Sequence, residues 1–201
     1  KPWLTLESDR LIGVGTSLKY YIEDGGVFYD ITPIRQTTAA GDVTFAAAPP
    51  THVITVTDTN HECRPGDFVT FSGAVGLGGD ITADVLNQEY QIQTTTNNTY
   101  TIHARTASTD INQYYSNGVM DDTAAYVNAT ATDTGNGGGS VVGEYQVQTG
   151  VDTSTFGPGW GAGTWSRGAW NSRASVNVLS ENLRLWQHDT FGEDLVFCIR
   201  D

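Results

Sequence analysis

Residues 18–31 read Leu18-Lys19-Tyr20-Tyr21-Ile22-Glu23-Asp24-Gly25-Gly26-Val27-Phe28-Tyr29-Asp30-Ile31. Aromatic and β-branched residues, which favour strands, stand on both sides of the turn Asp24-Gly25-Gly26. Glycine supplies the positive φ that a tight hairpin turn requires. The stretch therefore predicts two antiparallel strands, Leu18 to Glu23 and Val27 to Ile31.

The residues on either side extend this hairpin into a sheet. Two further strand-like runs, Trp3 to Glu7 and Leu11 to Val14, precede it. Pro33 closes the unit, because proline cannot donate a backbone hydrogen bond to a ladder. The first 36 residues are thus predicted to form a four-stranded up-and-down sheet.

From about residue 37 the chain becomes rich in Ala, Thr and Gly. Four short strand-like runs follow, separated by turn residues: Val53 to Thr57, Gly66 to Gly73, Tyr90 to Thr94 and Thr99 to Ile102. Such runs are typical of a small barrel or sandwich. Residues 105–140 are polar and end in a glycine-rich loop, and a strand from Val141 to Gln148 follows.

The C-terminal segment returns to the style of the first 36 residues. Trp160, Trp165 and Trp170 are spaced among glycines, and two strands are predicted at Leu183 to Trp186 and Leu195 to Ile199. No stretch has the 3.6-residue period of a helix longer than a turn or two. We therefore predict an all-β chain in which a host domain, residues 1–36 and 151–201, carries an inserted barrel or sandwich at residues 37–150.

The charge of the chain argues against two kinds of partner. It has 23 acidic and 10 basic residues, a net charge of -13 and a pI near 4.4. The few basic side chains are scattered, so they form no patch to neutralise nucleic-acid phosphates. The carboxylates would be repelled by anionic lipid headgroups, and no basic amphipathic helix offsets that repulsion.

No pattern in the sequence predicts a catalytic, metal or cofactor site. Cys63 and Cys198 lack metal-ligand spacing, which favours two reduced or buried thiols and leaves a single disulfide as the alternative. The histidines have no ligand-like spacing, and Asp133 with Asn136 misses the EF-hand register. Nucleophile-elbow, zinc-protease and phosphate-loop motifs are absent.

Several polar residues are better explained by turn chemistry. Side-chain to backbone hydrogen bonds in turns are typical of His61 after Asp58, of Asn97-Asn98, and of Asp42. Acidic pairs such as Asp121-Asp122 are expected by chance on an acidic surface, and adjacent strand residues point to opposite faces. We expect solvated surface there and not a hydrolase.

The host segments resemble a blade repeat of tailed-phage proteins. The resemblance is carried by Arg10 to Thr16, Tyr20-Tyr21-Ile22, Gly25-Gly26, Phe28-Tyr29 and Asp30-Ile31-Thr32-Pro33. The Trp-Gly segment, Leu183 to Trp186 and Phe191 to Leu195 resemble the next blade. These motifs are similar to the β-propeller domains of phage tail proteins, especially podoviral tail nozzles.

The insertion resembles a different module of phage structural proteins, one similar to a small β-barrel half-domain of ubiquitin-activating enzymes. The matching positions lie within residues 53–104: His61, Gly66-Asp67, Val69, Ser72-Gly73, Leu86-Asn87, Tyr90-Gln91-Ile92 and Asn98 to Ile102. The sequence departs from the pattern at Glu62 to Pro65 and in an insertion around residues 74–85. Nothing in it suggests ubiquitin chemistry.

These resemblances imply a non-enzymatic virion protein of the phage tail, without cofactor or metal, that contacts other virion proteins and copies of itself. A carbohydrate-binding tail adhesin is the alternative, in which Trp160, Trp165 and Trp170 would face the sugar rings of a host glycan. A capsid decoration protein is another.

The host segments are too short for a closed ring of about 4 to 8 four-stranded blades. The chain also starts at Lys1 without an initiator methionine and stops at Asp201 directly after an apolar run. We therefore expect either a fragment of a longer chain or sheet edges that neighbouring subunits pair. A domain whose tag or pro-segment has been removed is the alternative reason for these ends.

Overall fold

The computed structural model describes residues 2–4, 10–106, 115–116, 119–120, 126–150, 184–191 and 194–200. These residues form strands and one helix of four residues, so the predicted all-β class is confirmed. A helix that spans a membrane needs about 20 apolar residues, and no helix in the described ranges approaches that length.

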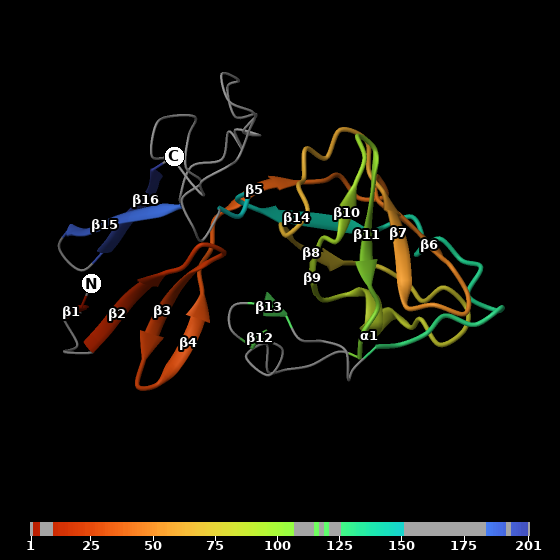
Figure 1. The fold of residues 1–201 in the computed structure, drawn as a ribbon, viewed down its shortest axis with the longest axis horizontal. Coiled ribbons are helices and arrows are strands. Elements are labelled where there is room, and N and C mark those ends of the chain that lie inside the picture. The colour runs from red at the N-terminus through yellow and green to blue at the C-terminus, as the bar shows by residue number, and fades with distance from the viewer. Residues whose placement is uncertain are drawn as a thin grey trace, which may run out of the picture. The chain divides into compact units, whose positions relative to one another are not determined.

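The chain divides into two compact units (Figure 1). Unit 1 comprises Lys1–Ile31 and Thr149–Asp201, and unit 2 comprises Thr32–Gln148. The first boundary expected from the sequence, after residue 36, falls inside strand β5 (Ile34–Thr37). That strand pairs with β14 (Val142–Gln146) and therefore lies with unit 2.

Unit 1 begins with the four-stranded sheet that the sequence predicts. Its strands are β1 (Pro2–Leu4), β2 (Arg10–Gly15), β3 (Tyr20–Asp24) and β4 (Val27–Asp30). They pair antiparallel in the order β1-β2-β3-β4, which confirms the up-and-down topology. Gly25 and Gly26 have φ of 58° and 93°, as the β3–β4 turn requires.

The C-terminal strands of unit 1 form a separate hairpin, β15 (Leu185–Phe191) with β16 (Asp194–Arg200). Within the unit its side chains pack on β3. Phe197 stacks on Tyr20 with ring centroids 4.5 Å apart, and the Tyr20 hydroxyl lies 2.8 Å from His188 Nδ1. Trp186 Nε1 donates to the carbonyl of Thr16 at 2.7 Å. Both ends of the sequence therefore contribute to one unit.

Unit 2 contains two four-stranded antiparallel sheets. The first has the order β10-β11-β7-β6 and comprises β10 (Thr94–Thr95), β11 (Thr99–His103), β7 (Val53–Thr57) and β6 (Thr44–Ala47). The second has the order β5-β14-β8-β9 and adds β8 (Phe68–Ser72) and β9 (Glu89–Gln91). A small hairpin, β12 (Tyr115–Ser116) with β13 (Val119–Met120), also belongs to this unit.

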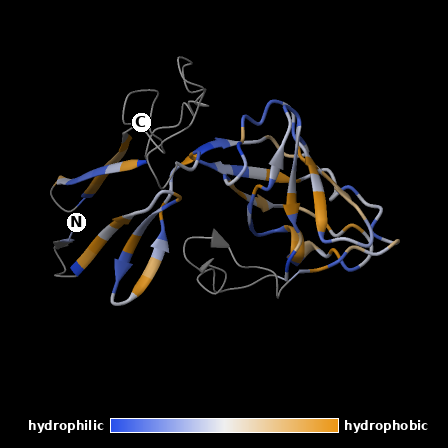
Figure 2. Ribbon diagram, viewed as in Figure 1, coloured by the Kyte–Doolittle hydropathy of each residue, from blue (hydrophilic) through white to orange (hydrophobic). Residues whose placement is uncertain are grey.

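The two sheets of unit 2 enclose one core. Phe45 on β6 meets Phe71 on β8 edge to face at 5.0 Å, and Ile54, Val56 and Ile102 are completely buried. Apolar and polar residues alternate along β7 and β11, so one face of each strand is buried. Figure 2 shows a hydrophobic stretch on β7 and another on β4 of unit 1.

The inserted unit contains no closed barrel among its described strands. Of the two forms that the sequence pattern allowed, a sandwich is the one observed. β9 and β10 have only three and two residues, so the chain passes from one sheet to the other without a long shared strand. Helix α1 (Ala83–Leu86) lies at the insertion that the sequence pattern marked, and Thr82 caps its first turn.

Candidate functional site

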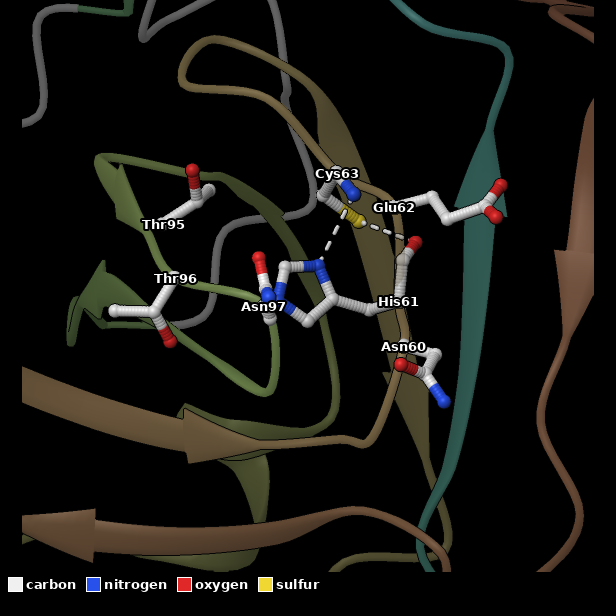
Figure 3. A pocket seen from close by; sticks show the side chains of 7 residues that line it. All are labelled: Asn60, His61, Glu62, Cys63, Thr95, Thr96 and Asn97. Atoms are coloured by element: carbon white, nitrogen blue, oxygen red, sulfur yellow. Dashed lines mark hydrogen bonds between the residues drawn. The ribbon is translucent and has the colours of Figure 1, made fainter.

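A pocket of about 410 Å³ lies in unit 2 between two polar segments (Figure 3). One segment follows β7, and the other is the turn between β10 and β11. The pocket is lined by Asn60, His61, Glu62, Cys63, Thr95, Thr96 and Asn97. All seven lie in parts of the chain that the structure describes, and none was predicted as a binding residue.

Two residues with a left-handed backbone conformation shape the first wall of the pocket, Asn60 to Cys63. Asn60 has a φ of 58° and Glu62 a φ of 54°, a region that asparagine tolerates better than most side chains. They turn the chain so that the imidazole of His61 lies inside, whereas the carboxylate of Glu62 points away from the pocket (Figure 3). The side-chain amide of Gln148 donates to the Glu62 carbonyl at 2.7 Å and fixes this backbone.

His61 is buried, with 1% of its surface exposed, and it confirms the predicted turn role. Its Nδ1 accepts a hydrogen bond from the backbone N–H of Cys63 at 3.0 Å. A nitrogen that accepts carries no proton, so in the neutral ring the proton is on Nε2. Nε2 has no hydrogen-bond partner among the described residues, and the ring meets Tyr100 edge to face at 4.9 Å.

Cys63 is buried beside His61 and is held as a thiol. Its Sγ donates to the His61 carbonyl at 3.3 Å and accepts from Arg35 Nη2 at 3.1 Å. Burial raises the pKa of the Cys63 thiol to about 12, although Arg35 pulls it in the opposite direction. The thiolate is the nucleophilic form, so this cysteine is unreactive near neutral pH. Cys198 is exposed, and both cysteines are free.

A chain of buried hydroxyls lies behind this wall. Tyr145 donates to the Asp58 carboxylate at 2.6 Å, and the hydroxyl of Tyr100 lies 2.9 Å from that of Tyr145. Burial raises the pKa of both tyrosines, so both remain protonated at neutral pH. Because Tyr145 gives its proton to Asp58, Tyr100 is the donor to Tyr145. Arg35 covers the Tyr145 ring at 5.4 Å from its centroid.

The second wall is a turn stabilised by Thr96. Its hydroxyl accepts from the backbone N–H groups of Asn98 and Thr99 at 3.4 and 3.1 Å. Asn98 connects the two walls through two hydrogen bonds. Its side-chain oxygen accepts from the backbone N–H of Asn60 at 3.3 Å, and its backbone carbonyl accepts from the backbone N–H of Asp58. The Asn98 side chain thus bonds to the other segment and not within its own turn, where Thr96 is the acceptor in place of the predicted Asn97 or Asn98. Away from the pocket, the predicted turn role of Asp42 is confirmed, because its carboxylate accepts from the backbone N–H of Ala39 at 3.2 Å.

The side chains of Thr95 and Asn97 complete the rim. Neither makes a hydrogen bond with another described residue, and Asn97 is exposed. Figure 3 shows the His61 ring directed toward the side of the pocket that Thr95, Thr96 and Asn97 form. The pocket therefore offers hydroxyl, amide and imidazole groups with unused hydrogen-bonding capacity.

Asp133, which with Asn136 misses the EF-hand register, is hydrogen-bonded to backbone N–H groups. Its carboxylate accepts from the N–H groups of Gly79, Ile81 and Thr130 at 2.8, 3.1 and 2.8 Å. Burial opposes ionisation of the carboxyl, but these hydrogen bonds outweigh it and lower its pKa. Within the described ranges no three His, Cys, Asp or Glu side chains gather where they could hold a metal ion.

Trp160, Trp165 and Trp170, the binding residues considered from the sequence, lie outside the described residues, as do Asp121 and Asp122. Sequence reasoning missed the pocket because its two walls are about 35 residues apart and each reads as an ordinary turn. Comparisons with protein-family models, curated proteins and solved structures found no match for this chain.

Proposed function

We propose that this chain is a non-enzymatic structural component of a phage virion, part of its tail, which acts through contacts between subunits. The resemblance of residues 1–36 and 151–201 to tail-protein blades motivates the proposal. The observation that carries it is the exposed edge of β4 in unit 1.

β4 ends the described sheet and pairs with β3 on one side only. Three consecutive apolar side chains are largely exposed on it: Val27 at 51%, Phe28 at 44% and Tyr29 at 53%. A sheet edge offers N–H and C=O groups to a further strand, and exposed apolar residues add a surface to bury. An edge of this kind is a hazard for a monomer and an advantage for a subunit of an assembly.

The buried chemistry of unit 2 also favours a structural role over a catalytic one. The Cys63 thiol is protonated, and the Asp133 carboxylate is saturated by backbone donors. Both groups stabilise loops through hydrogen bonds, and the Cys63 thiol at the pocket is not in its nucleophilic form.

Imaging of purified particles tests the proposal. Antibody against unit 2, coupled to gold, is expected to label the tails of particles from the phage that encodes this chain. Antibody pre-incubated with the purified chain as competitor serves as the control and should no longer label the tails. Labelling of the capsid would favour the decoration protein, and particles that lack the chain would refute any virion role.

A glycan array separates the adhesin alternative. If tryptophans bind sugar, Trp165→Ala should abolish array binding while the fold is retained. Binding that depends on Trp165 would replace the mechanical role with recognition.

A further inference from the structure

We propose that the pocket between Asn60–Cys63 and Thr95–Asn97 binds a single neutral sugar ring, with His61 Nε2–H as its innermost donor. The inference does not depend on a virion role. It rests on the hydrogen-bonding capacity, charge and size of the pocket.

The tautomer of His61 makes its Nε2 a hydrogen-bond donor. Because Nδ1 accepts from the Cys63 N–H, Nε2 carries the proton and can only donate. A buried donor without a partner is costly, so an acceptor at this position would be stabilising. A donor also excludes metal ions and ammonium groups as ligands of this nitrogen. The ligand must therefore present an oxygen acceptor.

The charge of the pocket favours a neutral ligand. The seven lining residues include no lysine or arginine, and the one carboxylate among them, on Glu62, points away. Behind the wall lie two opposite charges, Asp58 and Arg35, and the whole chain has a net charge of -13. No cation belongs to the lining that an anionic ligand would touch, and the net charge of the chain disfavours such a ligand. The acceptor should therefore belong to a neutral group.

The rim of the pocket carries two polar side chains that can bind sugar hydroxyls. The Thr95 hydroxyl and the Asn97 amide can each donate and accept, and neither is used by another described residue. Neighbouring hydroxyls of a sugar ring also donate and accept, so they match such groups in either direction. A volume of about 410 Å³ lies near the lower end of ligand pockets, which span roughly 300 to 1,000 Å³. This size suits a single sugar ring.

Access to Nε2 requires a side chain at the rim to move, since the nitrogen is buried. Asn97 is exposed and has no hydrogen-bond partner among the described residues, so its displacement costs little. We place the sugar between the Thr95–Asn97 turn and the imidazole edge, with one hydroxyl on Nε2–H.

Titration followed by NMR tests the site. The 15N-labelled chain is titrated with galactose, glucose and N-acetylglucosamine, and with glucuronic acid as the charged control. At least one neutral sugar is expected to shift the amide signals of Cys63 and Thr95 saturably, with a millimolar Kd. Glucuronic acid should bind roughly tenfold more weakly or not at all. If no neutral sugar moves these signals at tens of millimolar, or if the acid binds best, the proposal is wrong.

A pair of His61 variants isolates the two ring nitrogens. In His61→Asn the amide oxygen replaces Nδ1 as the acceptor for the Cys63 N–H, but no atom replaces Nε2. His61→Gln places an amide N–H near Nε2 and loses the inner acceptor. We expect His61→Asn to weaken sugar binding by roughly 2- to 10-fold, the effect of one neutral hydrogen bond, and His61→Gln to weaken it less.

A steric block keeps the test valid if His61 variants unfold. Asn97→Trp fills the mouth of the pocket from an exposed turn position and is expected to abolish binding while the melting temperature stays unchanged. Trp165→Ala is the matched control and should leave binding unchanged. Sugar binding that survives Asn97→Trp, or that disappears with Trp165→Ala, would place the site elsewhere and overturn the proposal.

Discussion

Unit 2 and unit 1 use their apolar residues in opposite ways. Every member of the buried hydrophobic cluster, from Val43 to Tyr145, belongs to unit 2. Among the described residues of unit 1, Tyr20 is the one buried hydrophobic side chain, whereas Val27, Phe28 and Tyr29 are exposed. Unit 2 thus encloses its own core, and the described strands of unit 1 present an apolar surface. The contrast favours the proposal that unit 2 folds around its own core and that the exposed sheet of unit 1 makes the contacts between subunits.

The largest expected difference between the units comes from two phenylalanine truncations. Phe71→Ala in unit 2 removes a ring that is 2% exposed and packs on Phe45 and Tyr90. It should cost about 3–5 kcal/mol. Phe28→Ala on β4 removes a ring that is 44% exposed and should cost about 1 kcal/mol or less.

The two units can be monitored separately in this experiment. All five tryptophans lie in the residue ranges of unit 1, so tryptophan fluorescence reports on unit 1 during denaturant unfolding. Backbone NMR signals of β7 and β11 report on unit 2. Equal losses for Phe71→Ala and Phe28→Ala would contradict the contrast between a closed core and an open surface.

Asp133→Asn should produce the next largest effect, a loss of about 2–3 kcal/mol in the stability of unit 2. The substitution removes an ionised acceptor for four backbone N–H groups and brings an amide N–H group among them. Because the folded pKa of Asp133 is lowered, its stabilisation is complete above the unfolded pKa and disappears as pH falls through the folded value.

The pH dependence of this variant supplies the check. The difference in unfolding free energy between the native protein and Asp133→Asn should be constant from neutral pH to about pH 5 and should shrink below about pH 4. A difference that grows as the pH falls would show that the carboxylate is destabilising.

Tyr145→Phe should have a smaller effect, about 1–2 kcal/mol. The change leaves the buried carboxylate of Asp58 without the Tyr145 donor and Tyr100 without an acceptor. Tyr100→Phe, the control, removes only the outer end of the same chain and should cost less. If Tyr100→Phe costs more than Tyr145→Phe, the assigned direction of the hydroxyl chain is wrong. Thermal denaturation of both variants at neutral pH measures this order.

The smallest effect on folding is expected for Val27→Lys, less than about 0.5 kcal/mol, because Val27 is half exposed on an edge strand. The same change should reduce self-association, since a lysine on a strand edge opposes pairing. Light scattering coupled to size-exclusion chromatography measures the mass, with Val75→Lys in unit 2 as the matched exposed control. If Val27→Lys and Val75→Lys have the same mass in solution, β4 does not mediate self-association.

Local patterns predicted the strands of this chain better than they predicted its long-range arrangement. Alternation located β7 at Val53–Thr57, and Asp24-Gly25-Gly26 located the β3–β4 turn. The N-terminal boundary of unit 2 was harder to predict, because Ile34–Thr37 reads as a continuation of the first sheet until its pairing with β14 is known. The choice between barrel and sandwich likewise depends on pairings that no local pattern contains.

The pocket shows the same limit at the level of single residues. The turn role of His61 follows from a local hydrogen bond and was predictable, whereas the Asn98 side chain bonds to Asn60 in the other segment. That these two turns face each other depends on the β11–β7 register, which pairs Thr99 with Thr57. The proton on Nε2 depends in turn on the N–H of Cys63. Sequence supplied the polar residues, but only the fold brings them together.

A cryo-electron microscopy map of the intact particle at side-chain resolution tests the central claim most directly. We predict that the chain is found in the tail, with Val27, Phe28 and Tyr29 of β4 covered by a neighbouring subunit. A chain missing from the particle, or one present there with β4 facing solvent in every copy, would contradict it.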